Sequence, residues 1–391
     1  MRQLALTRAT LLTPFNLIED ATLLIHGNII EAAGHSASVK IPSGYREVPL
    51  EGLIIAPGFI DIHLHGGNGS EVMSAIPSSL EELAKFYATH GVTSFLATTI
   101  SANPDQLLAV ARSYEFLNNS TYKGAKCLGI HLEGPYLSPE FAGMHNIDEI
   151  RHPSLDEIKQ IHRASNQGLK IITMAPEADG ALETAAALVK MGIICSIGHS
   201  NSDYETGLKA IESGFSSVTH CFNQLRPFHH RDPGVLGAIL TRKELTVELI
   251  ADGIHLHPAV IDIVLRLKGP ENIVLVSDAM APAGMPDGNY PSLNGKLTVA
   301  NGAVRNEAGQ LAGSTLTLDQ AVKNMLKFTE FSLNDVFRMV SYNPARLLGI
   351  NKRKGSLYPG KDADLVVLTT DLEVIMTMVG GEVISGLISI D

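Results

Sequence analysis

The fold of this chain is decided by the stretch Ala56-Pro57-Gly58-Phe59-Ile60-Asp61-Ile62-His63-Leu64-His65-Gly66-Gly67. An apolar run from Leu53 to Ala56 leads into it and is typical of a buried strand, and two glycines end it. Because residues i and i+2 of an extended chain face the same way, His63 and His65 present two imidazoles on one face. Such a pair can bind a metal ion at a strand end. For this motif alone, two unrelated loop histidines are an equal alternative.

Length and composition bound the class of protein. The 391 residues suffice for one large α/β barrel and a small second domain. The net charge of −11 argues against general nucleic-acid binding, although a local basic cluster can still hold an anionic small substrate. No apolar run is long enough to cross a bilayer, and the N-terminal segment lacks the apolar core of a secretory signal. The three cysteines show no metal or redox spacing. We therefore expect a cytoplasmic protein that binds neither nucleic acid nor membrane.

Strands and helices alternate through the middle of the chain, which is the pattern of a parallel sheet covered by helices. Helical patterns separate most of the apolar strand candidates; examples are 79–90, 104–117, 155–164, 181–191 and 204–213. The strand candidates are 53–62, 93–100, 127–133, 169–176, 193–199, 216–221, 246–251 and 272–278. Eight such strands favour a closed (β/α)8 TIM-like barrel over an open sheet.

Both ends of the chain read as short strands joined by turns. Residues 21–25 and 29–33 flank a hairpin signal, and residues 365–368 and 374–379 show the same pattern near the other end. Neither end has enough apolar surface to be stable alone, so we expect them to pair. The predicted domains are a small β-sandwich from 1–52 plus 355–391 and a barrel over 53–354. Within the barrel we expect an insertion at about 284–313, followed by helices over about 315–349.

Side chains able to bind a metal fall at the C-terminal ends of the predicted strands, where such barrels form their active sites. His63 and His65 end the first strand, and Glu133 ends the third. His199 and His220 end the fifth and sixth. Strand 7 leads into Asp252 and His255, and strand 8 ends at Asp278. Randomly placed residues would not select the same end of so many strands.

Imidazole and carboxylate ligands suit Zn²⁺ or Fe²⁺, with open positions left for water and substrate. Five candidate ligands allow one or two divalent ions, with Glu133 as the bridge. Asp278 has no neighbouring cation in the sequence and suits a general base that becomes an acid. Each residue also has a structural interpretation: Glu133 could cap a turn, Asp278 could form an Asx turn, and His199 or His220 could be core histidines. His131 is predicted to pack in the core.

Other segments suggest how a substrate is held. Asn223 and Gln224 follow His220, and Arg231 comes soon after in a His-His-Arg-Asp-Pro-Gly stretch. A basic group near backbone amides suits a phosphate, although a solvated basic loop is an equal interpretation. Met144 and His145 follow strand 3 and could place an imidazole over the pocket. The segment Leu311-Ala312-Gly313-Ser314 could offer backbone groups to a sugar hydroxyl or a phosphate.

At this point the sequence resembles the amidohydrolase superfamily and, within it, the N-acetylglucosamine-6-phosphate deacetylases. The matching motifs follow the family's order over nearly the whole chain. They are PGFIDxHxHG at 57–66, HLEGP at 131–135, GHS at 198–200, THxxN at 219–223, RxPG at 231–234, ADGxH at 251–255, SDAxAPAG at 277–284 and LAGS at 311–314. The first motif indicates only an amidohydrolase, whereas the motif around Glu133 is far more specific.

The resemblance implies a role for each matched residue. Glu133, His199 and His220 match the principal metal ligands, and His63 and His65 match a pair that holds a second metal in some members. Asp278 matches the catalytic acid/base, and His145 is expected to assist at the oxyanion. The matched substrate positions are Met144, His145, Asn223, Gln224, Arg231, Asp252, His255, Leu311, Ala312 and Gly313. Arg231, Asn223 and His255 are expected near the phosphate. Gln224 departs from the family, where a small residue is common.

The implied activity is metal-dependent hydrolysis of the acetamide of N-acetylglucosamine 6-phosphate to glucosamine 6-phosphate and acetate, a step of amino-sugar catabolism, by a homodimer. One alternative is a deacetylase of N-acetylgalactosamine 6-phosphate, because a single hydroxyl orientation separates the two substrates. Another is a cyclic amidase or dipeptidase, many of which bridge two metals with a carbamylated lysine. Lys170 lies at the start of a predicted strand, the wrong end for that role. A non-catalytic scaffold is disfavoured because every expected ligand is present.

Overall fold

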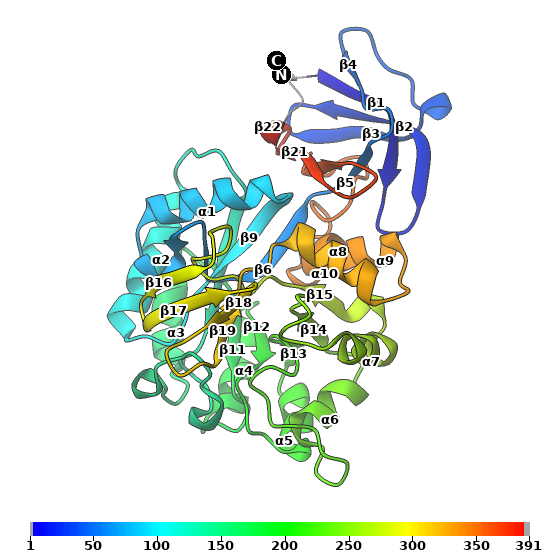
Figure 1. The fold of residues 1–391 in the computed structure, drawn as a ribbon. Coiled ribbons are helices and arrows are strands. Elements are labelled where there is room, and N and C mark those ends of the chain that lie inside the picture. Colours follow the sequence, from blue (N-terminus) through cyan, green and yellow to red (C-terminus); the bar gives the residue numbers. More distant parts are fainter. Residues whose placement is uncertain (1–2, 387–391) are drawn as a thin grey trace.

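The computed structural model describes residues 3–386 and contains two large sheets, one parallel and one formed by both ends of the chain (Figure 1). The parallel sheet has eight strands in chain order from one edge to the other. They are β6 (Phe59–Leu64), β9 (Val92–Thr98), β10 (Lys126–Glu133), β11 (Leu169–Met174), β12 (Ile194–Ile197), β13 (Phe215–Val218), β14 (Thr246–Leu249) and β15 (Ile273–Leu275). Most of their residues are buried, as expected of strands with both faces covered.

Contacts just beyond the last strand close the sheet into a barrel. Leu64 forms a parallel bridge with Ala279, and the amide of Asp278 donates to the carbonyl of His63 at 2.9 Å. The amide of His65 in turn donates to the carbonyl of Ala279 at 2.9 Å. The first strand is therefore joined to the segment after the eighth, which confirms the predicted (β/α)8 barrel.

Helices follow the barrel strands and cover the outside of the sheet (Figure 1). α3 shows why they form there: Ser154 caps its first turn, and Ile158 and Ile161 bury one stripe of its surface. The helices are α1 (Pro77–Thr89), α2 (Pro104–Asn118), α3 (Leu155–Ala164), α4 (Ala181–Lys190), α5 (Tyr204–Glu212), α6 (Gly234–Thr241), α7 (Pro258–Lys268), α8 (Leu318–Phe328), α9 (Leu333–Phe337) and α10 (Asn343–Leu347), with a π-helical turn at Arg338–Tyr342. The predicted helices differ from these at their ends by two residues or fewer. Within residues 3–386, no helix combines the length and the apolar character that crossing a membrane requires.

The second large sheet joins strands from the two ends of the chain, as predicted. Its order is β22-β21-β20-β5-β1-β2-β3, with β4 also paired to β1, and it has a separate hydrophobic core that includes Leu6, Leu23, Leu365 and Met376. The strands are β1 (Gln3–Leu12), β2 (Leu17–His26), β3 (Ile29–His35), β4 (Arg46–Pro49), β5 (Ile54–Pro57), β20 (Leu365–Leu368), β21 (Val374–Val379) and β22 (Glu382–Gly386). Residues 1–2 and 387–391 of the predicted sandwich lie outside the described part of the chain.

The predicted single strand 53–62 is two strands in the structure. β5 pairs with β1 and β20 in the terminal sheet, whereas β6 pairs with β9 in the barrel. Gly58 joins them, and its Cα lies so close to Thr93 that an added Cβ would sit 2.1 Å from the Thr93 methyl group. An apolar run shows burial but not which of two sheets buries it. We therefore propose that the barrel begins at Gly58 rather than at residue 53.

The segment after the eighth strand contains a small antiparallel sheet of four strands. They are β16 (Gly288–Ser292), β17 (Gly295–Ala300), β18 (Ala303–Arg305) and β19 (Leu311–Ser314). Leu297, Val299 and Val304 form its apolar core together with Met280 and Ala312. Ser314 at the end of β19 bridges to Ala279, so this sheet continues directly from the closing edge of the barrel.

We expect Gly58→Ala to destabilise the protein, because Thr93 must move to admit the new methyl group. Overpacking of this kind lowers the free energy of unfolding by about 1–3 kcal/mol. Urea denaturation with matched m-values measures the change. Gly288→Ala is the control, because an added Cβ there meets nothing closer than 3.6 Å. Equal stabilities of the two variants would contradict the tight junction at Gly58.

Candidate metal centre and substrate pocket

Six of the side chains predicted from the sequence converge at the C-terminal ends of the barrel strands. Each of them is at least 94% buried. Glu133 ends β10, and His63 lies in β6 with His65 directly after it. The others come from the turns after β12, β13 and β15. They are His63, His65, Glu133, His199, His220 and Asp278. The structure therefore brings together residues that are distributed over more than half of the sequence.

Three of these residues have a left-handed backbone. The φ angles of His199, His220 and Asp278 are 47°, 26° and 49°. Each residue lies two or three positions beyond its strand, so the predicted strands 193–199, 216–221 and 272–278 are shorter than expected. L-residues with a side chain adopt this region at a cost, and it persists where the surrounding structure fixes it. The turn directs each side chain into the barrel mouth.

Glu133 lies between two groups of imidazoles and faces each group with a different oxygen. Its Oε1 is 3.3 Å from Nε2 of His199 and 3.0 Å from Nε2 of His220. Its Oε2 is 3.5 Å from Nε2 of His63 and 3.3 Å from Nε2 of His65. One carboxylate thus offers one oxygen to each of two candidate metal positions.

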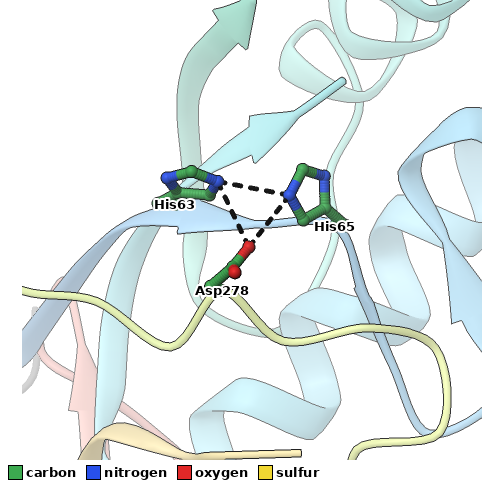
Figure 2. A group of neighbouring side chains, drawn as sticks. All are labelled: His63, His65 and Asp278. Carbon is green, nitrogen blue, oxygen red and sulfur yellow. Dashed lines mark hydrogen bonds and ion pairs between the residues drawn. The ribbon is translucent and has the colours of Figure 1, made fainter. Parts of the chain in front are cut away.

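Asp278 completes the group on the His63 side (Figure 2). Its Oδ1 lies 3.3 Å from Nε2 of His63 and 3.1 Å from Nε2 of His65, and the two Nε2 atoms are 3.2 Å apart. The backbone of Asp278 is held on both sides, because its amide donates to the carbonyl of His63 and its carbonyl accepts from the amide of Ser314. The position of this carboxylate is therefore fixed by the same bonds that close the barrel.

The hydrogen bonds of His199 indicate that a cation belongs in this centre. Its Nδ1 is 2.7 Å from the carbonyl oxygen of Phe141, which can only accept, so Nδ1 carries the proton. Burial lowers the pKa of His199 to about 4, so the ring is neutral at pH 7 and its Nε2 is a bare lone pair. That lone pair faces a carboxylate oxygen of Glu133. A divalent cation between the two atoms would turn this repulsion into ligation, so the donor set fits a metal.

His145 has the opposite tautomer and suits a different role. Its Nδ1 accepts from the backbone amide of Ser101 at 2.9 Å, so the proton of the neutral ring is on Nε2. That Nε2 lies 3.5 Å from Oε2 of Glu133 and lines the pocket. His145 therefore presents a hydrogen-bond donor, whereas His199 presents a lone pair.

The two central carboxylates remain ionised despite their burial. Burial alone would raise the pKa of Asp278, but the hydrogen bond from His65 and the charges of the surrounding histidines hold it well below its usual range. The pKa of Glu133 is also lowered, because the charge of His63 and hydrogen bonds from histidines outweigh its burial. Within residues 3–386, every ion-pair partner of either carboxylate is a histidine. In this part of the chain the two carboxylates are thus paired with imidazoles rather than with lysine or arginine.

A cavity opens beside these residues. His255 lies on its wall, and its Nδ1 is 2.6 Å from Oδ2 of Asp252. Burial would raise the pKa of Asp252, but His255 and two backbone amides lower it. The lining residues are His65, Glu133, Gly143, Met144, His145, His199, His220, Asn223, Gln224, His255, Asp278, Leu311 and Gly313. Most of the predicted substrate positions therefore surround one cavity.

Three predicted substrate residues do not line the cavity. Ala312 faces the apolar core of the four-stranded sheet, because neighbours in a strand alternate between faces. Asp252 stands behind His255 rather than in the cavity. Arg231 is exposed, and its guanidinium contacts His230. A basic loop after a strand does not by itself show where its arginine points.

Sequence reasoning missed Glu248, a fully buried carboxylate in β14 that touches His63. A charged residue inside the apolar run 246–251 was the signal that could have revealed it. Two other expectations agree with the structure. His131 is held in the core between the carbonyl of Ile62 and the hydroxyl of Thr173. Lys170 lies at the start of β11 and donates to Gln167, away from the metal-capable groups.

Comparison with known proteins finds one family over most of the chain. Residues 54–384 match the amidohydrolase family. An N-acetylglucosamine-6-phosphate deacetylase from Bacillus subtilis (strain 168) is 40% identical over 333 residues, which cover 84% of each chain. An N-acetylgalactosamine-6-phosphate deacetylase from Escherichia coli is 36% identical over 375 residues, covering 96% of this chain and 97% of the relative.

The similarity extends to solved structures. A mutant N-acetyl-D-glucosamine-6-phosphate deacetylase from Mycobacterium smegmatis, in complex with N-acetyl-D-glucosamine-6-phosphate, superposes with a TM-score of 0.91 at 33% sequence identity. The match covers 98% of this chain and all of that one. The barrel, the terminal sheet and their connections are therefore shared.

We expect Glu133→Gln to abolish tight metal binding, because it removes the charge between the two groups of imidazoles. The affinity for Zn²⁺ should fall by at least about 100-fold. Elemental analysis after dialysis of the metal-loaded protein measures the loss. The control is Asp319→Asn, which alters a mostly buried carboxylate paired with His90 at 3.2 Å outside this centre. Equal metal content in the two variants would show that Glu133 does not bind the metal.

Proposed function

The chain belongs to the amidohydrolase family, and we propose that it hydrolyses the acetamide of N-acetylglucosamine 6-phosphate to glucosamine 6-phosphate and acetate. The observation that carries the proposal is a metal-capable centre with an ionised aspartate, opening into a cavity lined by most of the predicted substrate residues. Relatives that bear this activity in their names match most of the chain. The reaction would be a step of amino-sugar catabolism.

We propose that the residues of this centre would hold two divalent ions, with zinc or iron as the best fit to imidazole and carboxylate ligands. Glu133, His199 and His220 would hold one ion. His63 and His65 would hold the second together with the other oxygen of Glu133. The division of the two Glu133 oxygens between two pairs of imidazoles supports this count. Bound there, such an ion lowers the pKa of water and polarises a carbonyl group.

Asp278 is proposed as the acid/base. Its carboxylate is ionised, lies at the edge of the cavity and is held in place by backbone bonds on both sides. It would accept a proton from the water that attacks the acetamide carbon. It would then deliver that proton to the sugar nitrogen as the carbon–nitrogen bond breaks, so that acetate and the amine leave.

His145 is proposed to donate a hydrogen bond to the carbonyl oxygen while negative charge develops on it. The Ser101 amide fixes the Nε2 proton of His145 in the direction of the cavity. A donor fixed before the reaction stabilises the oxyanion without reorganising at the moment of attack, which is often a large part of catalysis.

We propose that the phosphate end of the substrate lies near Asn223 and His255. Both line the cavity, and Asp252 orients the His255 ring by accepting from its Nδ1. Met144, Leu311 and Gly313 would border the sugar. Gln224 packs against Gly143, where an added Cβ would lie 3.0 Å from its side chain, so it narrows this part of the pocket.

A deacetylase for N-acetylgalactosamine 6-phosphate is the second candidate function. The Escherichia coli relative with that name covers 96% of the chain, against 94% for the glucosamine-named relative from Vibrio furnissii. The two substrates differ in the orientation of one hydroxyl, which no contact described above selects.

Acetate release from the zinc-reconstituted protein tests the function. We expect the highest kcat/KM for N-acetylglucosamine 6-phosphate in a panel that includes its galactosamine epimer and unphosphorylated N-acetylglucosamine. Preference for the epimer would support the second candidate. Absence of acetate from every phosphorylated sugar would refute the proposed activity.

We expect Asp278→Asn to lower kcat by about 10²–10⁴-fold, the usual contribution of a positioned proton carrier. Asp262→Asn is the matched control, since Asp262 pairs with Arg266 on the surface of α7 and should leave the rate unchanged. Near-normal turnover of the Asp278 variant would exclude this aspartate as the acid/base.

We further propose a cytoplasmic homodimer in which Arg231 serves the pocket of the neighbouring protomer. All three cysteines are free and buried, as suits a reducing compartment. Arg231 is exposed and does not line its own pocket, yet a phosphate would need a bidentate cation of this kind.

Mixed dimers test the role of Arg231. Arg231→Ala alone should raise KM for the phosphosugar, and Asp278→Asn alone should be nearly inactive. If Arg231 acts across the interface, mixing the two variants restores one complete site in each hybrid dimer. Under random assortment, about half of the dimers are hybrids, and each hybrid has one complete site out of two. Roughly a quarter of the wild-type activity should therefore return. No gain over the separate variants would place Arg231 outside the neighbouring pocket.

A further inference from the structure

Glu248 is a buried charge that the proposed mechanism does not use. It lies in β14 between Val247 and Leu249, and its exposed fraction is 0%. Acidic side chains are almost never fully buried unless they are paired. Within residues 3–386, its ion-pair partner is His63. A carboxylate retained at this depth is therefore explained by what it does to that imidazole.

The contact between the two side chains fixes the ligand atom of His63. Oε2 of Glu248 is 2.9 Å from Nδ1 of His63. In a hydrogen bond between an imidazole N–H and a carboxyl oxygen the oxygen accepts, so this contact places the His63 proton on Nδ1 and leaves Nε2 to bind a cation. Nε2 is the atom that faces Glu133 and Asp278. Without this bond, the ring could take the other tautomer or rotate away from the centre.

The same carboxylate oxygen also reaches the second group of ligands. The backbone amide of His220 donates to it at 3.2 Å, and the carbonyl of Glu248 accepts from the amide of Cys221 at 2.9 Å. His220 has a φ of 26°, so its backbone needs such restraint. One residue on the seventh barrel strand thus contacts His63 on the first strand and the turn that carries His220 after the sixth.

We propose that Glu248 is a positioning residue that sets the affinity of the ion held by His63. The inference rests on the proposed metal centre and adds to it a residue that would not touch the ion. A partner that holds the far nitrogen of a metal-binding histidine fixes its tautomer and raises its basicity, and losing such a partner typically costs 10–100-fold in metal affinity. The effect should be larger for the ion at His63, whose side chain Glu248 holds, than for the ion at His199 and His220.

Zinc titration of the metal-free full-length protein in competition with a chromophoric chelator tests this inference without substrate. His63→Ala identifies the binding step that depends on His63, because that step should disappear. In Glu248→Gln, which keeps the shape but loses the charge, we expect the zinc dissociation constant of that same step to rise by about 10–100-fold. The other step should change less than about threefold, because the backbone of His220 retains a partner there.

Val247→Ala is the matched control for stability, since it removes packing from the same strand with a side chain on the opposite face. It should lower the thermal midpoint of the metal-free protein and leave both zinc affinities unchanged. A purely structural Glu248 would behave like Val247, with lower stability and unaltered zinc binding, and that result would overturn the proposal. So would equal weakening of both steps, or persistence of both steps in His63→Ala. Failure of the deacetylase proposal would appear separately, as normal zinc binding with no acetate released.

Discussion

The structure depends on two buried carboxylates whose ion-pair partners, within residues 3–386, are all histidines. Glu133 and Asp278 stay ionised in the barrel mouth, and the nearby imidazoles direct ring nitrogens at them. At His199 the geometry leaves a lone pair facing a carboxylate oxygen, which is unfavourable unless a cation lies between them. The protein thus folds into an arrangement whose electrostatic complement is a metal ion, and the pocket is organised around it.

The barrel supplies this arrangement through the ends of its strands. β6 carries His63, and His65 follows it directly. Three other strands are followed by left-handed turns that direct His199, His220 and Asp278 inward. One hydrogen bond both closes the barrel and positions Asp278, because the Asp278 amide donates to the carbonyl of His63. The hydrogen bonds that close the barrel therefore also hold the site in place. Barrels commonly combine a stable sheet with active-site residues on the loops at one end of it.

Much of this could be predicted from the sequence, because periodicity and strand-end position are local signals. Such local signals predicted the helices, the (β/α)8 order and the convergence of the metal-capable residues. The predictions that were wrong or missing concerned contacts between segments that are distant in the sequence. The run 53–62 did not reveal that Ile54–Pro57 belong to another sheet, and the basic loop did not reveal that Arg231 is exposed and does not line its own pocket. Glu248 was missed because a single acidic residue in an apolar strand has meaning only once its partner on the first strand is known.

The junction at Gly58 has a consequence for how the molecule is made. β5 lies directly upstream of the strand that carries His63 and His65, and its neighbours in the terminal sheet are β1 and β20. A ribosome releases β5 early and β20 among the last residues of the chain. During translation, the strand that carries His63 therefore follows a terminal sheet that still lacks β20. On its other side, the barrel to which it belongs is not yet closed. The cluster of imidazoles and carboxylates therefore cannot be complete before Asp278, which follows the eighth barrel strand, has been synthesised.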